Sequence, residues 1–238
     1  MRSKIFFCLI VMLAVIPACK KGSTFSGAKV YVLTDFKAGI IYTYTYNSDG
    51  TTNTIQKNIG GKTTFQYSSG NVLMSSINAN NTTYDATSYT LNSAGYAQSS
   101  QGQFQSQNLS STYTYDGSGH LIEQKNYRSG TLLNDAVYTF PSTVATERDI
   151  TTNGVQAIDY YAYVTNITNS MGVQNKGENF LGVSSNNPIS LDYVVNQAGD
   201  TIDIITYRYK YDGSPRVDTF SSYNKAGQRQ DTMAFSYY

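Results

Sequence analysis

The sequence predicts an all-β protein, an antiparallel meander of about twelve or more strands in consecutive hairpins. Three observations support this class. Strand-favouring residues are abundant, with 22 Tyr among 238 residues, whereas Pro occurs only 4 times and Trp is absent. Aromatic residues recur at alternate positions, which places them on one face of a strand. These runs lead into Asn, Asp or Ser followed by Gly, a composition typical of tight turns.

The same hairpin pattern recurs along the chain. Predicted turns begin at positions 47, 68, 92 and 116, and again at 212 and 224. A repeat of about 20–24 residues holds two strands and two connections, so six such units indicate roughly twelve strands or more. Glycine adopts positive φ without strain. We therefore expect positive φ at four turn glycines: Gly50, Gly95, Gly119 and Gly227.

The sequence predicts an export signal at the N-terminus. Arg2 and Lys4 precede an uncharged run from Ile5 to Ile16. This run is shorter than the roughly 20 residues that a membrane-spanning helix needs, and it fits a secretory signal peptide over residues 1–18. Residues 19–28 are predicted to form a tether, and residues 29–238 a single all-β domain.

The segment Ile16-Pro17-Ala18-Cys19 resembles the lipobox of bacterial lipoproteins. The resemblance implies cleavage before Cys19, whose sulfur and amine then carry acyl chains. Several acyl chains on one residue give stable membrane attachment. The resemblance also implies that the protein is a lipoprotein of the outer membrane. The residues after Cys19 lack the acidic run that resembles a surface-export signal, which favours the periplasmic face.

A less regular stretch follows Pro141. Within it, residues 159–164 are predicted to form a strand. Residues 166–187 are polar and contain glycine, with Phe180 and Leu181 as the strong apolar anchors. We predict a long connection there, laid over the sheet and plugging one end.

Two resemblances bear on the fold. Residues 113–121 resemble the YD repeat of RHS-type bacterial cell-surface proteins. The lipobox, residues 184–188 and residues 207–212 together resemble a family of Bacteroidetes lipoprotein domains of unknown function, described as porin-like in fold. This resemblance covers roughly residues 40–238. It implies a sheet curled into an open or partial barrel, and no known activity.

Composition excludes several function classes. Lys plus Arg number 17 and Asp plus Glu number 16, so there is no basic field for nucleic acid. One His cannot build a zinc site, and no nucleotide-binding or serine-hydrolase motif occurs, so we predict no metal, no cofactor and no catalytic residue. The acids Glu123, Glu147 and Glu178 leave a carboxylate-dependent glycoside hydrolase as the third hypothesis, because the sequence alone cannot pair them.

The leading hypothesis is a non-enzymatic binding or scaffolding role, with an envelope protein or a polysaccharide as partner. The alternative is a glycan-binding module that stacks sugar on Tyr207, Tyr209 and Tyr211. These three share one strand face, while Arg208 and Lys210 occupy the other. Because two cations are seldom buried without partners, we expect the Tyr face to be inward.

Two further patterns concern the surface. Asp200-Thr201-Ile202 and Asp231-Thr232-Met233 resemble the Bacteroidetes O-glycosylation sequon, which makes Thr201 and Thr232 candidate modification sites. At the C-terminus, Thr232, Ala234 and Ser236 share the strand face of Tyr238. An outer-membrane barrel would place apolar residues there, so this register disfavours an integral barrel.

Overall fold

The computed structural model describes residues 29–104, 107–139, 145–152, 155–164, 169–172, 176–182, 187–211 and 216–237. The predicted signal peptide, the tether and Cys19 lie outside the described residues, as does the predicted turn at position 212.

The described residues form sixteen strands and one short 3-10 helix. In chain order the strands are β1 (Val30–Asp35), β2 (Ile40–Tyr46), β3 (Thr52–Lys57), β4 (Lys62–Ser68), β5 (Asn71–Ile77), β6 (Thr83–Leu91), β7 (Ala97–Phe104), β8 (Gln107–Tyr115), β9 (Leu121–Arg128), β10 (Thr131–Thr139), β11 (Ala145–Thr152), β12 (Val155–Tyr163), β13 (Ile189–Asn196), β14 (Thr201–Tyr211), β15 (Val217–Tyr223) and β16 (Arg229–Tyr237). The helix η1 spans Asn179–Leu181. Each strand pairs antiparallel with the next, which confirms the predicted all-β meander.

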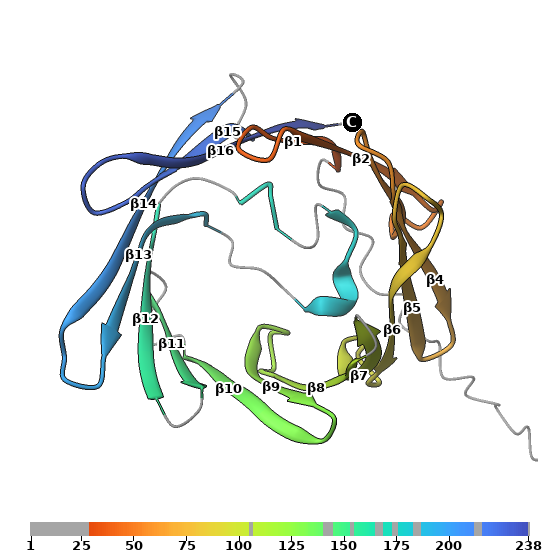
Figure 1. The fold of residues 1–238 in the computed structure, drawn as a ribbon, viewed down its shortest axis with the longest axis horizontal. Helices are drawn as coiled ribbons and strands as arrows, with labels where there is room; N and C mark the ends of the chain where they lie inside the picture. The colour runs from red at the N-terminus through yellow and green to blue at the C-terminus, as the bar shows by residue number, and fades with distance from the viewer. Residues whose placement is uncertain are drawn as a thin grey trace, which may run out of the picture.

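The sheet curls until its two ends meet. β1 pairs antiparallel with β16, and the register sets Val30 opposite Tyr237 and Leu33 opposite Phe235. The sixteen strands therefore close into one barrel, which appears as a ring in Figure 1. The curl goes further than the open or partial barrel that the resemblance implied, because the pairing of β1 with β16 leaves no free sheet edge.

The hairpin turns share one hydrogen-bonding scheme. At Asn92 the backbone N–H bonds the carbonyl of Tyr96, and the Asn92 carbonyl accepts from Gly95. The Asn92 side-chain oxygen also accepts from the N–H groups of Ala94 and Tyr96, at 3.0 Å each. The same backbone bonds recur in seven turns of the described residues. Six of these begin with a short polar residue, namely Asn47, Asn78, Asn92, Asp116, Asn196 and Asn224, and the seventh begins with Lys57. The short polar side chain thus holds the reversal that the sequence predicts.

The fourth residue of such a turn needs positive φ. The four glycines predicted to adopt it have φ values of +81, +86, +88 and +73 at positions 50, 95, 119 and 227, which confirms the prediction. In the Asn78 turn this place is taken by Asn81, at φ +58. Asn is one of the few residues other than Gly that tolerates this region.

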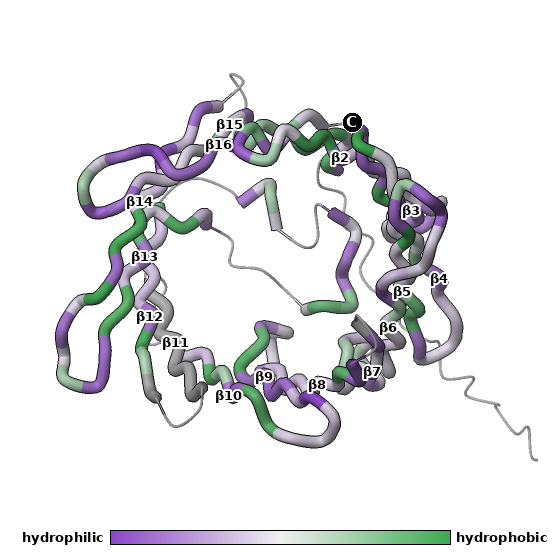
Figure 2. Tube along the Cα trace, viewed as in Figure 1, coloured by the Kyte–Doolittle hydropathy of each residue, from purple (hydrophilic) through white to green (hydrophobic). Residues whose placement is uncertain are grey.

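The apolar clusters of the barrel lie on the inner face of the sheet. One apolar cluster joins Leu33, Tyr44, Val217 and Phe235, from β1, β2, β15 and β16. A second joins Phe65, Val72 and Ala97 of the wall to Phe180 of η1. Along each strand these residues alternate with residues that face outward. Figure 2 shows hydrophilic and hydrophobic residues interleaved along the strands.

Hydroxyl and amide side chains dominate the outer face. Thr45 faces Thr54 across β2 and β3, with their hydroxyl oxygens 2.7 Å apart. On β16, Met233, Phe235 and Tyr237 pack in the first apolar cluster, so Thr232, Ala234 and Ser236 face outward. Among the described residues, outward apolar side chains such as Ile41 and Leu73 are scattered.

Within the described ranges, no helix is both long enough and apolar enough to cross a membrane.

Candidate functional site

The described parts of the connection between β12 and β13 lie inside the barrel. We call residues 164–188 the inner connection; Figure 1 shows its described parts, with η1, within the ring of strands. The sequence predicts a connection laid over the sheet and plugging one end. In the structure the face that this connection covers is the inner one, where its apolar anchor Phe180 is buried against strand residues. An apolar ring gains more from that burial than from a place over the polar outer face.

The inner connection is bonded to two parts of the wall, at β15–β16 and at β3. On one side the hydroxyl of Ser170 lies 2.9 Å from that of Tyr237 and accepts the backbone N–H of Val217, also at 2.9 Å. On the other side the hydroxyl of Thr52 donates to the Lys176 carbonyl, and its N–H donates to the Gly177 carbonyl at 3.1 Å. These bonds fix the segment between β15–β16 and β3.

Two of its glycines make close backbone contacts. A Cβ at Gly177 would lie 2.7 Å from the carbonyl oxygen of Gly50 and 2.8 Å from the N of Thr52. A Cβ at Gly182 would lie 2.7 Å from the ring of Tyr115. A side chain at either position would therefore push the inner connection away from the wall.

Glu178 places a carboxyl group among phenols inside the barrel. Desolvation raises its pKa above the usual range, and the charge of Lys176 only partly opposes that shift. The pKa of Tyr44, Tyr67 and Tyr89 is also raised, chiefly by burial and additionally by the charge of Glu178. At neutral pH the interior around Glu178 therefore favours neutral groups.

Of the three acids named from sequence, the two whose side chains the structure describes, Glu123 and Glu178, do not form a pair. Glu123 faces outward, where its carboxylate lies 2.7 Å from the ammonium of Lys125. Glu178 lies inside the barrel, and the side chain of Glu147 is not among those that the structure describes. Glycoside hydrolysis needs two carboxyl groups about 5–9 Å apart across one substrate site. The geometry of Glu123 and Glu178 supplies no such site.

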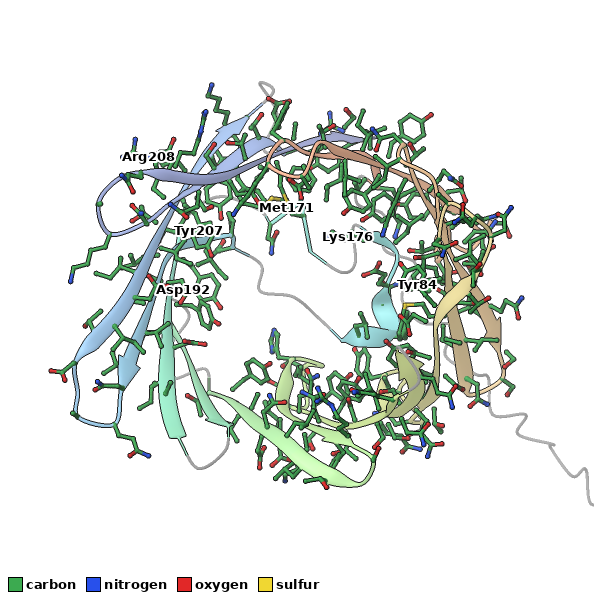
Figure 3. The ribbon with its side chains drawn as sticks, in the orientation of Figure 1. Tyr84, Met171, Lys176, Asp192, Tyr207 and Arg208 are labelled. Atoms are coloured by element: carbon green, nitrogen blue, oxygen red, sulfur yellow. The ribbon has the colours of Figure 1, made fainter. Side chains whose placement is uncertain are left out.

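The row of Tyr207, Tyr209 and Tyr211 faces inward. The Tyr209 ring centre lies 6.1 Å from that of Phe220, and its hydroxyl donates to the Ile189 carbonyl. Tyr211 packs with Tyr209 against the first apolar cluster. Figure 3 shows Tyr207 on the inner side of β14 and Arg208 on the outer side, where the guanidinium lies 4.5 Å from the Tyr223 ring centre. The three rings thus belong to the packed interior.

The candidate modification sites lie on outer surfaces. Thr201 is exposed at the start of β14, and the adjacent Ile202 is 60% exposed. The hydroxyl of Thr232 lies 2.8 Å from that of Ser221, its outward-facing partner on β15. Cys19 lies outside the residues that the structure describes. Among the described residues, no three His, Cys, Asp or Glu side chains are grouped as metal ligands.

A groove crosses the outer face of β6, β7 and β8. It has a volume of about 670 Å³, and the β9–β10 turn at Ser129 and Gly130 borders it. The outward side chains that line it are Ala86, Ser88, Gln101, Gln103, Asn108 and Ser110. We call this the outer groove. Sequence analysis did not single it out, although Gln101-Gly102-Gln103, a mid-strand glycine between two amides, marks its centre.

A second concavity lies at the β1–β2 and β15–β16 turns. It measures about 410 Å³ and is lined by charged residues, including Lys37, Arg229 and Asp231, beside Phe36 and Thr232. We call this the turn pocket. Phe36 is 60% exposed. The turn pocket thus combines an aromatic ring with charges of both signs.

Both concavities lie toward one end of the barrel. In an up-and-down meander, successive connections alternate between the two ends. The start of β1 and the inner connection lie at one end, which we call the near end. The β1–β2, β7–β8, β9–β10 and β15–β16 connections lie at the far end. The turn pocket lies at these far-end turns, and the outer groove is bordered by the β9–β10 turn.

No protein-family model matches the sequence, and no curated protein matches it. Solved structures that resemble the barrel include two porin-like proteins from Bacteroides. A porin-like protein from Bacteroides uniformis superposes with a TM-score of 0.70 at 16% identity, covering 91% of this chain and 100% of that one. A porin-like protein from Bacteroides vulgatus gives 0.63 at 13% identity, covering 89% and 99%.

The fold is porin-like. The match spans nearly the whole of both chains, which supports the fold that the resemblance to a porin-like Bacteroidetes family implied. The likeness concerns the fold alone. In this porin-like barrel the inner connection occupies the interior, so the concavities described above lie on the outer face and at the far-end turns.

Proposed function

We propose that the protein is a lipid-anchored envelope protein with a binding or scaffolding role and no enzymatic activity. Its place would be the outer membrane, attached through acyl chains on Cys19, with the periplasmic face favoured over the cell surface. The lipobox-like segment and the porin-like fold support this proposal. It needs no nucleic acid, metal or cofactor.

The observation that carries the proposal is the separation of the two barrel ends. The tether leads into the near end, at the start of β1, whereas the outer groove and the turn pocket lie toward the far end. Residues 20–28 reach at most about 30 Å when fully extended. An anchor at Cys19 would therefore hold the near end toward the membrane and present the far end to a partner.

Metabolic labelling with a radioactive or alkyne-bearing fatty acid tests the attachment. The full chain should incorporate label into the envelope fraction, and Cys19→Ser should incorporate none. Cys8→Ser is the matched control, because Cys8 precedes the proposed cleavage site and its loss should leave labelling intact. Label retained by Cys19→Ser would refute the anchor. Protease treatment of whole and permeabilised cells distinguishes the surface from the periplasmic face.

A further inference from the structure

Small residues lie in and beneath the outer groove on β6, β7 and β8. A Cβ on Gly102 would lie 2.6 Å from the hydroxyl of Thr87 and 2.8 Å from the carbonyl of Ala86. Only glycine therefore permits the close approach of β6 and β7 there. On the outer side, the floor of the groove carries only the short side chains of Ala86, Ser88 and Ser110.

The polar groups of the groove are uncharged. Gln101, Gln103 and Asn108 supply amides, and Ser88 and Ser110 supply hydroxyls, whereas no charged residue is among the described residues that line it. The Gln103 amide donates to the Asn108 side-chain oxygen at 3.1 Å. Because an amide offers two donors and an acceptor, this pair keeps further donors and acceptors for a ligand. The turn pocket, by contrast, is lined by Lys37, Arg229 and Asp231.

An aromatic ring flanks this uncharged surface. Tyr127 on β9 is the register partner of Ser110, so its side chain stands on the same outer face beside the groove. Directly paired residues have Cβ atoms about 4.5–5.5 Å apart. The next residue across is Leu132, which is 47% exposed. The groove thus joins amides and hydroxyls to an apolar flank.

We propose that the outer groove binds an uncharged oligosaccharide segment. Sugar hydroxyls both donate and accept hydrogen bonds, as the amides and hydroxyls of the groove do. The apolar face of a sugar ring fits the flank of Tyr127. A charged ligand would find no opposite charge among the lining side chains. The volume of about 670 Å³ lies within the range of small-ligand sites.

This inference rests on the proposed function, since an anchor at the near end leaves the groove accessible to a polymer. It also moves glycan binding away from the β14 tyrosines, which are packed in the interior. The groove would select its ligand by hydrogen bonding to hydroxyl groups and not by charge.

Native affinity electrophoresis of the full chain tests the proposal, with dextran, mannan and arabinoxylan as neutral polysaccharides and polygalacturonate as the charged comparator. We expect at least one neutral polymer to retard the protein and polygalacturonate to leave it unretarded. Gln101→Ala should weaken that retardation at least tenfold. Gln66→Ala is the matched control, because Gln66 is an exposed glutamine on β4 outside the groove.

Three outcomes would overturn the inference: no retardation by a neutral polymer, retardation by polygalacturonate alone, or equal retardation of the wild type, Gln101→Ala and Asn108→Ala. Fatty-acid labelling of the same preparations separates the two proposals. Labelled protein without glycan binding refutes the groove and keeps the anchor. Glycan binding that depends on Gln101, with no label on Cys19, refutes the anchor and keeps the groove.

Discussion

The ring of Phe180 on the inner connection lies 5.0 Å, centre to centre, from the ring of Tyr89 on β6, with the two planes inclined at 60°. Phe65 and Tyr67 of β4 approach the same ring at 6.4 and 6.3 Å. Such tilted geometries are favourable for aromatic pairs. Phe180 is therefore a buried apolar point of attachment between the inner connection and the wall.

We expect Phe180→Ala to lower the free energy of unfolding by about 3–5 kcal/mol, since it removes a buried ring and leaves a cavity. Urea denaturation followed by circular dichroism measures the change. Phe36→Ala is the control: Phe36 is 60% exposed, and its loss should stay within about 0.5 kcal/mol. Equal effects of the two substitutions would contradict the assigned packing of the inner connection.

Gly177→Ala tests the close contact of the inner connection with β3. Gly177 has φ +74, and its Cβ would overlap the Gly50 carbonyl and the Thr52 nitrogen. Gly199 has φ +87 with no atom near its Cβ position, so Gly199→Ala reports the cost of backbone strain alone. That cost is about 1–2 kcal/mol. We expect Gly177→Ala to cost at least about 1 kcal/mol more than Gly199→Ala in denaturant unfolding.

Glu178→Gln tests the buried carboxyl through pH. Burial raises the pKa of Glu178 in the folded protein, so folding favours the protonated form. Protonated Glu178 contributes its full share to the free energy of unfolding when the pH is below the pKa that Glu178 has in the unfolded chain. That contribution is lost as the pH rises through the higher pKa that Glu178 has in the folded protein. Glu178→Gln should therefore raise Tm at pH 8, and the difference from wild type should shrink toward pH 4.

Glu123→Gln is the comparison, because the pKa of Glu123 is shifted in the opposite direction from that of Glu178. The hydrogen bond and charge of Lys125 lower the pKa of Glu123, so its contribution is present at neutral pH and is lost on acidification. Glu123→Gln should not raise Tm at pH 8. A Tm for Glu178→Gln below that of wild type at pH 8 would show that the carboxylate is stabilised where it lies.

Two substitutions at Tyr209 separate ring packing from hydrogen bonding. Tyr209→Ala removes a ring packed on Phe220 and should cost about 3 kcal/mol or more. Tyr209→Phe keeps the ring and loses only the bond to the Ile189 carbonyl, at about 1 kcal/mol. Thermal and urea unfolding of both variants measure the two contributions. A Tyr209→Ala protein as stable as wild type would place this ring outside the core.

The hairpins could be predicted because their signals are local. In the turn at Asn92, the Asn92 side chain bonds a backbone N–H of the turn, and Gly95 adopts the positive φ that the turn needs. Neither contribution depends on residues elsewhere in the chain. The inward direction of Tyr209 also follows from its neighbours, since Arg208 and Lys210 must occupy the opposite face. Period-2 alternation and turn chemistry therefore define strands, reversals and faces.

Closure and the outer groove could not be predicted, because they depend on residues far apart in sequence. Val30 and Tyr237 are register partners, yet neither side chain specifies the other. The entry of Phe180 into the interior depends on how wide the finished barrel is. Gln101 and Asn108 resemble other polar residues of a chain with 26 Ser and 20 Asn, and only the pairing of β7 with β8 brings them together.

The pairing of β1 with β16 has a consequence for how the chain folds. β1 finds one neighbour in the first hairpin, but its other neighbour lies about 200 residues later, so this contact is the most distant in sequence and forms slowly. Until β16 docks, the partly folded sheet keeps two open edges, which are templates for pairing with other chains. The last hairpin therefore governs whether the nascent protein matures or aggregates.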